Sequence, residues 1–355
     1  MTYFLKNGNT FRATPESSLD ISKSLPALTY SVKKDMTGQY FLNVIDDFSL
    51  PKKFYGNLEV KANKIINTFM DRPAGTGVLL SGEKGSGKTQ LARFISVKLR
   101  EMNIPTLIIN EEHCGEEFNN FIQVIDQPVV VIFDEFEKVY SDAAQEALLT
   151  LFDGAQITQK LFLVTCNDVY AINNHMTNRP GRFYYHLKYD GVDAQFIREY
   201  CDDNLKDDVS NQKEVIVRFS TMFRTFNFDM LKALVEELNR YGGTVKDHID
   251  DLNAKPTNDA GGTVYVFDRI TVNGVALTED RIGEKQKNVN PLVRGFELYL
   301  CTSNDEDIPS WEYVEFMPEE IVEYNNDCVK YVTDEGIVLE MSKKKEKTVS
   351  YFDYL

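Results

Sequence analysis

The chain of 355 residues has few cysteines and no long apolar run, and each shortage excludes a class of protein. Five Cys without a CxxC pair do not form the disulfide framework of a small secreted domain, and reduced thiols in a cytoplasm fit better. The densest apolar run, VVVIF at 129–133, is strand-sized and far below the ~20 residues that span a bilayer. The N-terminal MTYFLKNGNTF lacks the basic-then-apolar layout of a signal peptide. We therefore expect a cytoplasmic protein without membrane association.

Basic residues are also in short supply. The chain has 39 Lys and Arg against 55 Asp and Glu, a formal net charge of −16. Such a composition argues against a protein that coats nucleic acid, because phosphate binding usually needs a basic surface, although a basic pore inside an acidic body stays open. Residues 301–340 hold twelve acidic residues and one Lys, and so carry −11 of the total. This stretch is either a solvated face or an acidic docking surface.

Patterning divides the chain into four regions. An N-terminal β-rich unit, an α/β domain, a helical lid and a β-rich accessory domain are expected at 1–50, 51–190, 191–243 and 244–355. In the first, LTYSV (28–32) and QYFLNVI (39–45) predict a hairpin. In the second, continuous apolar strands alternate with helices, which indicates a parallel sheet covered on both faces. Its expected strands are 77–81, 106–110, 129–133 and 161–167, and its expected helices are 89–102, 116–125 and 143–152.

The two C-terminal regions differ in pattern. The last helix of the lid is expected to start at an N-cap, Asn227, and to end at the YGG of 241–243. The accessory domain consists of short β-rich runs, and its last expected strand is TVSYF at 348–352. Its Trp311 is the only tryptophan of the chain. We expect Trp311 in the core of this domain, with a partner-binding anchor as the alternative.

A phosphate-binding motif follows the first strand of the α/β domain. GEKGSGKT at 82–89 fits G-x-x-x-x-G-K-[ST] between an apolar strand and an amphipathic helix. The backbone N–H groups of such a loop meet phosphate oxygens, Lys88 reaches the β- and γ-phosphates, and the Thr89 hydroxyl coordinates Mg²⁺. The sequence thus predicts ATP and Mg²⁺ as cofactors. The expected nucleotide-binding residues are Gly82, Glu83, Lys84, Gly85, Ser86, Gly87, Lys88, Thr89 and Gln90.

Three polar residues stand at the ends of later strands. Asp134 and Glu135 follow the strand at 129–133, at the sheet edge where parallel sheets bind ligands. Asp134 is expected to hold Mg²⁺, and Glu135 to polarise the attacking water. Asn167 ends the strand at 161–167, where a neutral amide can orient the water and contact the γ-phosphate. A general base indicates a hydrolase rather than a passive nucleotide binder.

Arg179 and Arg182 of NRPGR complete a set of four motifs in order, GEKGSGKT, VVVIFDE, LVTCN and NRPGR. This set resembles the AAA+ ATPase module in its AAA subgroup, over about residues 50–240. The resemblance implies a P-loop NTPase parallel sheet with a C-terminal helical lid, which makes an α/β fold class with added β-rich ends. It also implies that Arg179 and Arg182 reach the nucleotide site of a neighbouring subunit. ATP hydrolysis would then require a homo-oligomeric ring, a hexamer or a heptamer.

Two departures from the family pattern bear on function. The start of the last lid helix, FNFDMLKAL, offers no sensor-2 arginine. The segment at 111–115, EEHCG, stands where threading members carry an aromatic pore loop, and it is short and acidic. We expect its His113 and Cys114 in an exposed loop. The shortening is similar to that of the mitochondrial AAA translocase of a folded iron–sulfur protein, and the motif run also looks like AAA ATPases of large tailed phages, which would place the chain in a host cytoplasm.

Three tasks compete for such an ATPase. The favoured one is remodelling or movement of a protein partner, bound through the C-terminal β domain. The second is a nucleic-acid-linked ATPase of the helicase or clamp-loader type, which the acidic segment at 111–115 argues against. The third is a nucleotide-gated ring scaffold.

Overall fold

The chain folds into two compact units. The computed structural model describes residues 2–7, 10–15, 22–153, 158–177, 179–223, 225–249, 251–252, 264–283, 289–292, 295–302, 310–324 and 328–344. The first unit comprises Met1–Lys52, Glu59–Ser81 and Lys88–Lys188, and the second comprises Lys53–Leu58, Gly82–Gly87 and Tyr189–Leu355. No helix among the described residues is long and apolar enough to cross a membrane.

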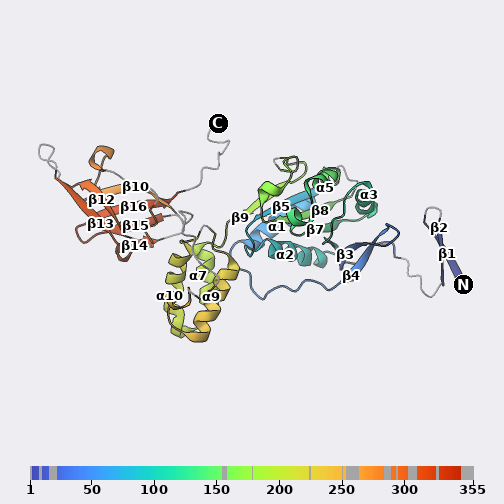
Figure 1. Cartoon of the computed structure of the whole chain (residues 1–355), viewed down its shortest axis with the longest axis horizontal. Helices are drawn as coiled ribbons and strands as arrows, with labels where there is room; N and C mark the ends of the chain where they lie inside the picture. Colours follow the sequence, from blue (N-terminus) through green and yellow to red (C-terminus); the bar gives the residue numbers. More distant parts are fainter. Residues whose placement is uncertain are drawn as a thin grey trace. The chain divides into compact units, whose positions relative to one another are not determined.

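Seven described strands of the first unit form one sheet in the order β4-β3-β6-β7-β8-β5-β9 (Figure 1). They are β4 (Tyr40–Ile45), β3 (Thr29–Lys34), β6 (Thr106–Ile109), β7 (Val129–Phe133), β8 (Lys160–Cys166), β5 (Thr76–Gly82) and β9 (Tyr185–Tyr189). The strands from β3 through β6, β7 and β8 to β5 run parallel, and β4 pairs antiparallel with β3. The α/β P-loop NTPase fold expected from the sequence is confirmed.

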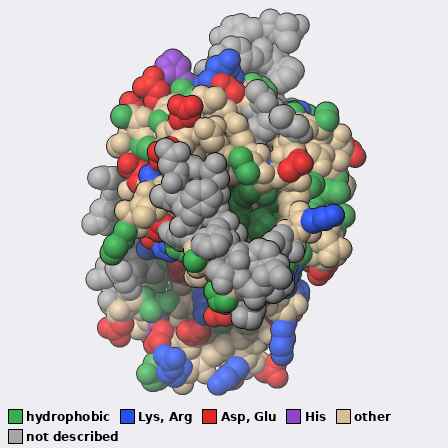
Figure 2. Space-filling view, turned by 90° about the vertical axis from the view of Figure 1, so that its right-hand side faces the viewer, with side chains coloured by type: hydrophobic (Ala, Val, Ile, Leu, Met, Phe, Trp, Pro, Cys, Tyr) green, Lys and Arg blue, Asp and Glu red, His purple; other side chains and the backbone are tan. Residues whose placement is uncertain are grey.

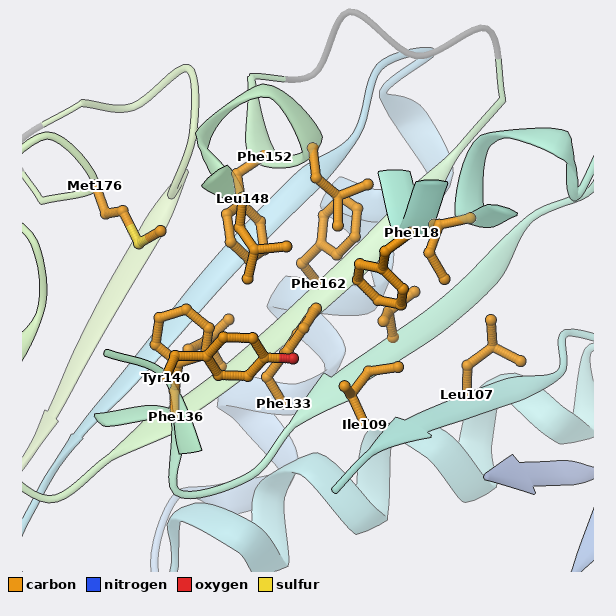
Figure 3. Close-up of a cluster of buried hydrophobic side chains, with 14 of the residues drawn as sticks. Leu107, Ile109, Phe118, Phe133, Phe136, Tyr140, Leu148, Phe152, Phe162 and Met176 are labelled. Atoms are coloured by element: carbon orange, nitrogen blue, oxygen red, sulfur yellow. The ribbon is translucent and has the colours of Figure 1, made fainter. Parts of the chain in front are cut away.

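Helices cover both faces of this sheet. They are α1 (Leu58–Asp71), α2 (Lys88–Glu101), α3 (Glu116–Val124), α4 (Phe136–Val139), α5 (Asp142–Ala147) and α6 (Leu149–Phe152). One face carries a core in which side chains of α3 to α6, such as Phe118 and Phe152, pack on Phe133 and Phe162 of the strands (Figure 3). The helix expected at 143–152 is two short helices, because the chain turns tightly at Leu148.

The N-terminal residues contribute two hairpins. The expected hairpin is present as β3 and β4, and it extends the central sheet beyond β6. A second hairpin, β1 (Thr2–Asn7) with β2 (Thr10–Pro15), forms a separate two-stranded sheet that the sequence analysis did not predict.

The helical part of the second unit contains α7 (Ala194–Asn204), α8 (Lys213–Ser220), α9 (Phe228–Tyr241) and α10 (Val245–Ile249). The expected cap of α9 is confirmed, since Asn227 Oδ1 accepts the Met230 N–H at 2.9 Å. Gly242 ends α9 with a φ of 70°, as the YGG sequence predicts. The four helices share an apolar core that includes Ile197 and Leu234.

The β-rich part of the second unit is built from antiparallel strands. Five form a sheet in the order β11-β10-β16-β15-β14, and two form the hairpin β12–β13. The strands are β10 (Tyr265–Val272), β11 (Val275–Ala276), β12 (Phe296–Cys301), β13 (Trp311–Phe316), β14 (Ile321–Tyr324), β15 (Cys328–Val332) and β16 (Ile337–Lys343). Phe296, Phe316 and Tyr331 pack together in their core. The strand expected at 348–352 lies outside the described residues.

Candidate nucleotide site

The phosphate loop joins β5 to α2, the two elements that the sequence placed on either side of it. Gly85 and Gly87 have φ angles of 75° and 96°, the left-handed backbone that turns successive N–H groups toward one side. Gly85 O accepts the Phe228 N–H at 3.1 Å, and a Cβ on Gly85 would lie 2.6 Å from Asp229 Oδ2. Only glycine therefore fits at position 85. Of the other loop residues, Glu83 and Lys84 are exposed, Ser86 is buried, and Gly82 and Gln90 are half-buried.

Lys88 is the first residue of α2, and its side chain is only 6% exposed. Its Nζ donates to Asn167 Oδ1 at 3.1 Å, so the phosphate loop lysine and the amide after β8 meet as predicted. Burial lowers the pKa of Lys88, and the nearby Cys166 thiol and the carboxylates of Glu137 and Asp134 act in the opposite direction. A desolvated ammonium group beside a neutral amide is suited to bind an anion from the solvent side.

Asp134 and Thr89 also meet at this edge of the sheet. Phe133 pairs with Val164, and this register places Asp134 beside Thr165 of β8. Asp134 Oδ1 accepts hydrogen bonds from Thr89 Oγ1 at 3.2 Å and from Thr165 Oγ1 at 2.6 Å. The two hydroxyls fix the carboxylate, and Thr165 is a contributor that motif reading missed. Carboxylate and hydroxyl oxygens are the ligands that Mg²⁺ prefers, so Thr89 and Asp134 fit the expected metal.

Glu135 occupies a backbone conformation that is rare for a non-glycine residue, with φ 49° and ψ 47°. The turn is held by the Glu135 N–H, which donates to Thr165 Oγ1 at 2.9 Å. The Glu135 carboxylate is partly exposed, and Lys138 Nζ donates to its Oε1 at 2.6 Å. Strained backbone maintained by neighbouring hydrogen bonds is typical of catalytic positions.

Glu137 is a further polar residue that the sequence analysis did not select. Its Oε1 accepts both the backbone N–H of Asn167 at 2.8 Å and the Nδ2–H of the same residue at 3.0 Å. The Asn167 amide is thereby oriented with its oxygen toward Lys88. The other oxygen of Glu137, Oε2, is buried and has no hydrogen-bond partner among the described residues. The signal was the third carboxylate of the DEFE sequence, two residues after Glu135.

Arg179 and Arg182 differ in their surroundings. Arg179 is exposed, and it has no ion-pair partner in the described part of the chain. Arg182 is only 7% exposed and binds Asp153 in a bidentate manner, with Nε at 2.6 Å from Oδ1 and Nη2 at 3.1 Å from Oδ2. Its Nη1 donates to the His175 carbonyl. Arg182 lowers the pKa of Asp153, chiefly through the hydrogen bond between them.

The segment at 111–115 is fastened to the first unit, and the expectation of an exposed His113 was wrong. His113 is 5% exposed, and its Nε2 lies 3.3 Å from the Val32 carbonyl of β3. The Tyr140 hydroxyl lies 3.2 Å from the carbonyls of Glu111 and His113 and accepts the His113 N–H. The hairpin of β3 and β4 supplies the acceptor for His113. No pattern within residues 111–115 could reveal this contact.

Residues 78–190 match the family model described as "ATPase family associated with various cellular activities (AAA)". Over this segment the chain is similar to the AAA domain. The match spans the end of the phosphate-loop strand, both acidic positions after β7 and the two arginines, and it supports an AAA+ ATPase that binds nucleotide. No curated protein matches the chain. The likenesses to the mitochondrial translocase and to phage ATPases stay predictions.

Proposed function

We propose that the chain is a Mg²⁺-dependent ATPase that acts as a homo-oligomeric ring. One observation carries the proposal, namely the pair of contacts from Lys88 Nζ to Asn167 Oδ1 and from Thr89 Oγ1 to Asp134 Oδ1. They bring the start of α2 to the ends of β7 and β8. Residues that are separated by 45 and by 79 positions in the sequence thus form one anion- and metal-binding edge. This edge follows the phosphate loop, whose N–H groups can bind an anion.

Each residue of this edge has a defined role in the proposal. The loop amides and Lys88 bind the phosphates of ATP, and Thr89 and Asp134 hold Mg²⁺, which neutralises phosphate charge when bound. Glu135 accepts the proton of the attacking water. Asn167, oriented by Glu137, supplies its amide to the γ-phosphate without adding charge. The β- to γ-phosphoanhydride is then cleaved to ADP and phosphate.

The arginines are proposed to act on the nucleotide of a neighbouring subunit. Arg179 is exposed and can extend across a subunit boundary, where a guanidinium stabilises the charge of the transition state. Arg182 has to leave Asp153 before it can do the same, so in this conformation it braces the turn that presents Arg179. The geometry therefore favours Arg179 as the finger, with Arg182 joining it after a rearrangement.

Glu135→Gln tests the role of the base. The amide keeps the size of the side chain but cannot take a proton, so ATP binding is expected to persist while turnover falls by about 10³. Binding of a fluorescent ATP analogue and phosphate release measure the two quantities. Unchanged turnover would refute the assignment of Glu135.

Mixing of two inactive variants tests the shared site. Arg179→Ala and Lys88→Ala remove contributions to opposite sides of a subunit boundary. A mixture is expected to regain part of the activity, because some boundaries then combine an intact phosphate loop with an intact arginine pair. A pair of proteins that never rescue each other, although size-exclusion chromatography shows mixed rings, would rule out catalysis across the boundary.

A folded protein partner is the proposed object of this ATPase. The segment at 111–115 is tied down by Tyr140 and β3, so it offers no projecting aromatic side chain to grip an extended polypeptide. On the face shown in Figure 2, acidic and basic side chains are interspersed and the basic ones form no continuous patch, which gives no support to a nucleic-acid substrate. Turnover stimulated by DNA would favour the helicase or clamp-loader alternative. Stable rings with very slow hydrolysis would favour the scaffold.

A further inference from the structure

The hairpin β12–β13 of the second unit presents three aromatic side chains on one face. Tyr299 lies directly opposite Tyr313, and Cys301 lies opposite Trp311, so these positions share a face of the hairpin. The ring of Tyr299 is 5.2 Å from that of Trp311 and 4.6 Å from that of Tyr313. We call Tyr299, Trp311 and Tyr313 the aromatic face.

Packing within the domain explains only the centre of the aromatic face. A Cβ on Gly283 would lie 3.0 Å from Tyr299 Cδ1, so the Tyr299 ring rests on this glycine. The side chains that build the core, such as Leu298 and Val314, come from the opposite face of the hairpin. Tyr313 is 72% exposed, and Tyr299 is still 37% exposed. Trp311 is half-buried. A contiguous group of aromatic rings that reaches the surface is a recognised mark of an interaction surface.

Two carboxylates lie on the same face as the rings. Glu297 and Glu315 are directly opposite each other in the register, and both are exposed. Like charges in this arrangement repel each other and destabilise the hairpin. Neither carboxylate forms an ion pair, and no Lys or Arg stacks on the three rings, among the residues that the structure describes. A cation could therefore pair with the carboxylates of this face and stack on its aromatic rings.

We propose that the aromatic face, with Glu297 and Glu315, binds a Lys- and Arg-rich segment of a protein partner. Cationic side chains stack on exposed aromatic rings, and they pair with carboxylates at the same time. The acidity of residues 301–340, with a net charge of −11, adds long-range attraction for such a segment. A nucleic acid would meet two carboxylates that form no ion pair with any described residue. The role of this binding in the work of the ATPase rests on the proposed function. The surface and the chemistry of the partner are inferred from the hairpin itself.

The single tryptophan makes the binding measurable. Trp311 belongs to the aromatic face, so its fluorescence reports on this surface alone. The full-length protein is titrated, without nucleotide, with a synthetic peptide of alternating Arg and Gly. A saturable change in emission that weakens as salt is raised is expected. A matching peptide of Glu and Gly, and a single-stranded oligonucleotide, are expected to give no saturable change.

Matched variants separate specific binding from general attraction to an acidic protein. The double variant Glu297→Gln, Glu315→Gln is expected to raise the Kd of the Arg–Gly peptide about tenfold. Tyr313→Ala is expected to raise this Kd several-fold, whereas Tyr313→Phe is expected to leave it unchanged. Glu312→Gln is the control, because Glu312 is an exposed carboxylate of the same strand on the other face, opposite Leu300. Equal effects of the Glu312 and Glu315 changes, equal binding of the acidic peptide, tighter binding of the oligonucleotide, or no binding would each overturn the proposal.

The outcome is independent of ATP hydrolysis. Peptide binding is expected to be unchanged in Glu135→Gln, and ATP turnover without peptide is expected to be unchanged in Tyr313→Ala. Failure of peptide binding in an active ATPase would remove this inference alone. Failure of hydrolysis in a protein that still binds the peptide would remove only the proposed function.

Discussion

Two buried lysines lie at opposite ends of the parallel strands. Lys88 follows the C-terminal end of β5, and Lys160 begins β8 at the other edge of the sheet. Burial lowers the pKa of both, in Lys160 to about 8. Lys160 Nζ donates to Ile125 O at 2.8 Å, to Gln127 O at 3.2 Å and to Thr158 Oγ1. Carboxylates and an amide surround Lys88, whereas main-chain carbonyls and a hydroxyl surround Lys160.

The different surroundings of Lys88 and Lys160 show where a sheet covered on both faces can carry a reactive site. The central strands β6, β7 and β8 are buried at every position, so their polar side chains can act only at their ends. At the edge of Lys160 the ammonium satisfies carbonyls of a connecting segment, which is a structural task. At the edge of Lys88, an ammonium, carboxylates and a neutral amide from three strand ends converge beside a loop of N–H donors. A buried lysine thus serves binding at one edge and stability at the other.

The largest effect is expected for Lys88→Ala. Loss of the ammonium removes the positive charge that stabilises the phosphates in both the ground state and the transition state. Turnover is therefore expected to fall by at least about 10³. The melting temperature is expected to stay close to that of the wild type, because the change also removes a desolvated charge. Phosphate release and thermal unfolding measure the two quantities. A collapse of stability would make Lys88 a structural residue like Lys160.

Arg179→Ala and Arg182→Ala test whether the edge that contains Lys88 also has a cation with a structural role. Turnover is expected to fall by about 10³ in Arg179→Ala, with unchanged stability, because an arginine finger contributes to the rate alone. Arg182→Ala is expected to lower both turnover and melting temperature, since it leaves Asp153 without its bidentate partner. Asp153→Asn is the companion variant, and it is expected to share the loss of stability. Identical behaviour of Arg179→Ala and Arg182→Ala would contradict this division.

Lys160→Met is the converse test. It keeps the volume of the aliphatic chain but leaves the carbonyls of Ile125 and Gln127 without this donor, so the free energy of unfolding is expected to fall by about 2 kcal/mol. Turnover per folded molecule is expected to be unchanged. Urea unfolding and phosphate release at a temperature where both proteins are folded provide the measurements. A selective loss of turnover would erase the distinction between the two edges.

The smallest effect is a dependence of stability on pH. The folded-state pKa of Lys160, about 8, lies below the ordinary value of 10.5. Between these values the unfolded chain binds more protons than the folded one, so the contribution of Lys160 to the free energy of unfolding rises with pH. The slope is at most about 1.4 kcal/mol per pH unit. Relative to Lys160→Met, the wild type is expected to gain stability from pH 8 to 9.5, and parallel curves for the two proteins would contradict the shift.

Local patterns predicted the sheet and the motifs well. The strands around 129–133 and 161–167 are continuous apolar runs, and the loop between Gly82 and Thr89 has a sequence that determines its own backbone. These features depend on neighbouring residues, so a single sequence contains them. β9 was missed because its alternating polar residues resemble those of an exposed loop, and β14 was missed because it is only four residues long.

Long-range contacts account for the rest of what the sequence could not predict. The burial of His113 depends on a carbonyl of β3, 81 residues away, and the roles of Thr165 and Glu137 follow from the register of β7 with β8. The sequence predicted two equivalent arginines, and the positions of Asp153 and of the His175 carbonyl distinguish Arg182 from Arg179. Trp311 was expected in the core, and its partner-binding alternative gained weight only when the face of β13 was known.

The pairing of β3 with β6 has a consequence for how the protein is made. Thr29 pairs with Thr106, so the strand that extends the sheet has to wait for a partner synthesised 77 residues later. Contacts so distant along the chain form slowly, because a large loop has to close first. On the ribosome, the hairpin of β3 and β4 emerges with the edge of β3 open to other strands. Its protection from aggregation during translation then depends on how soon β6 leaves the exit tunnel.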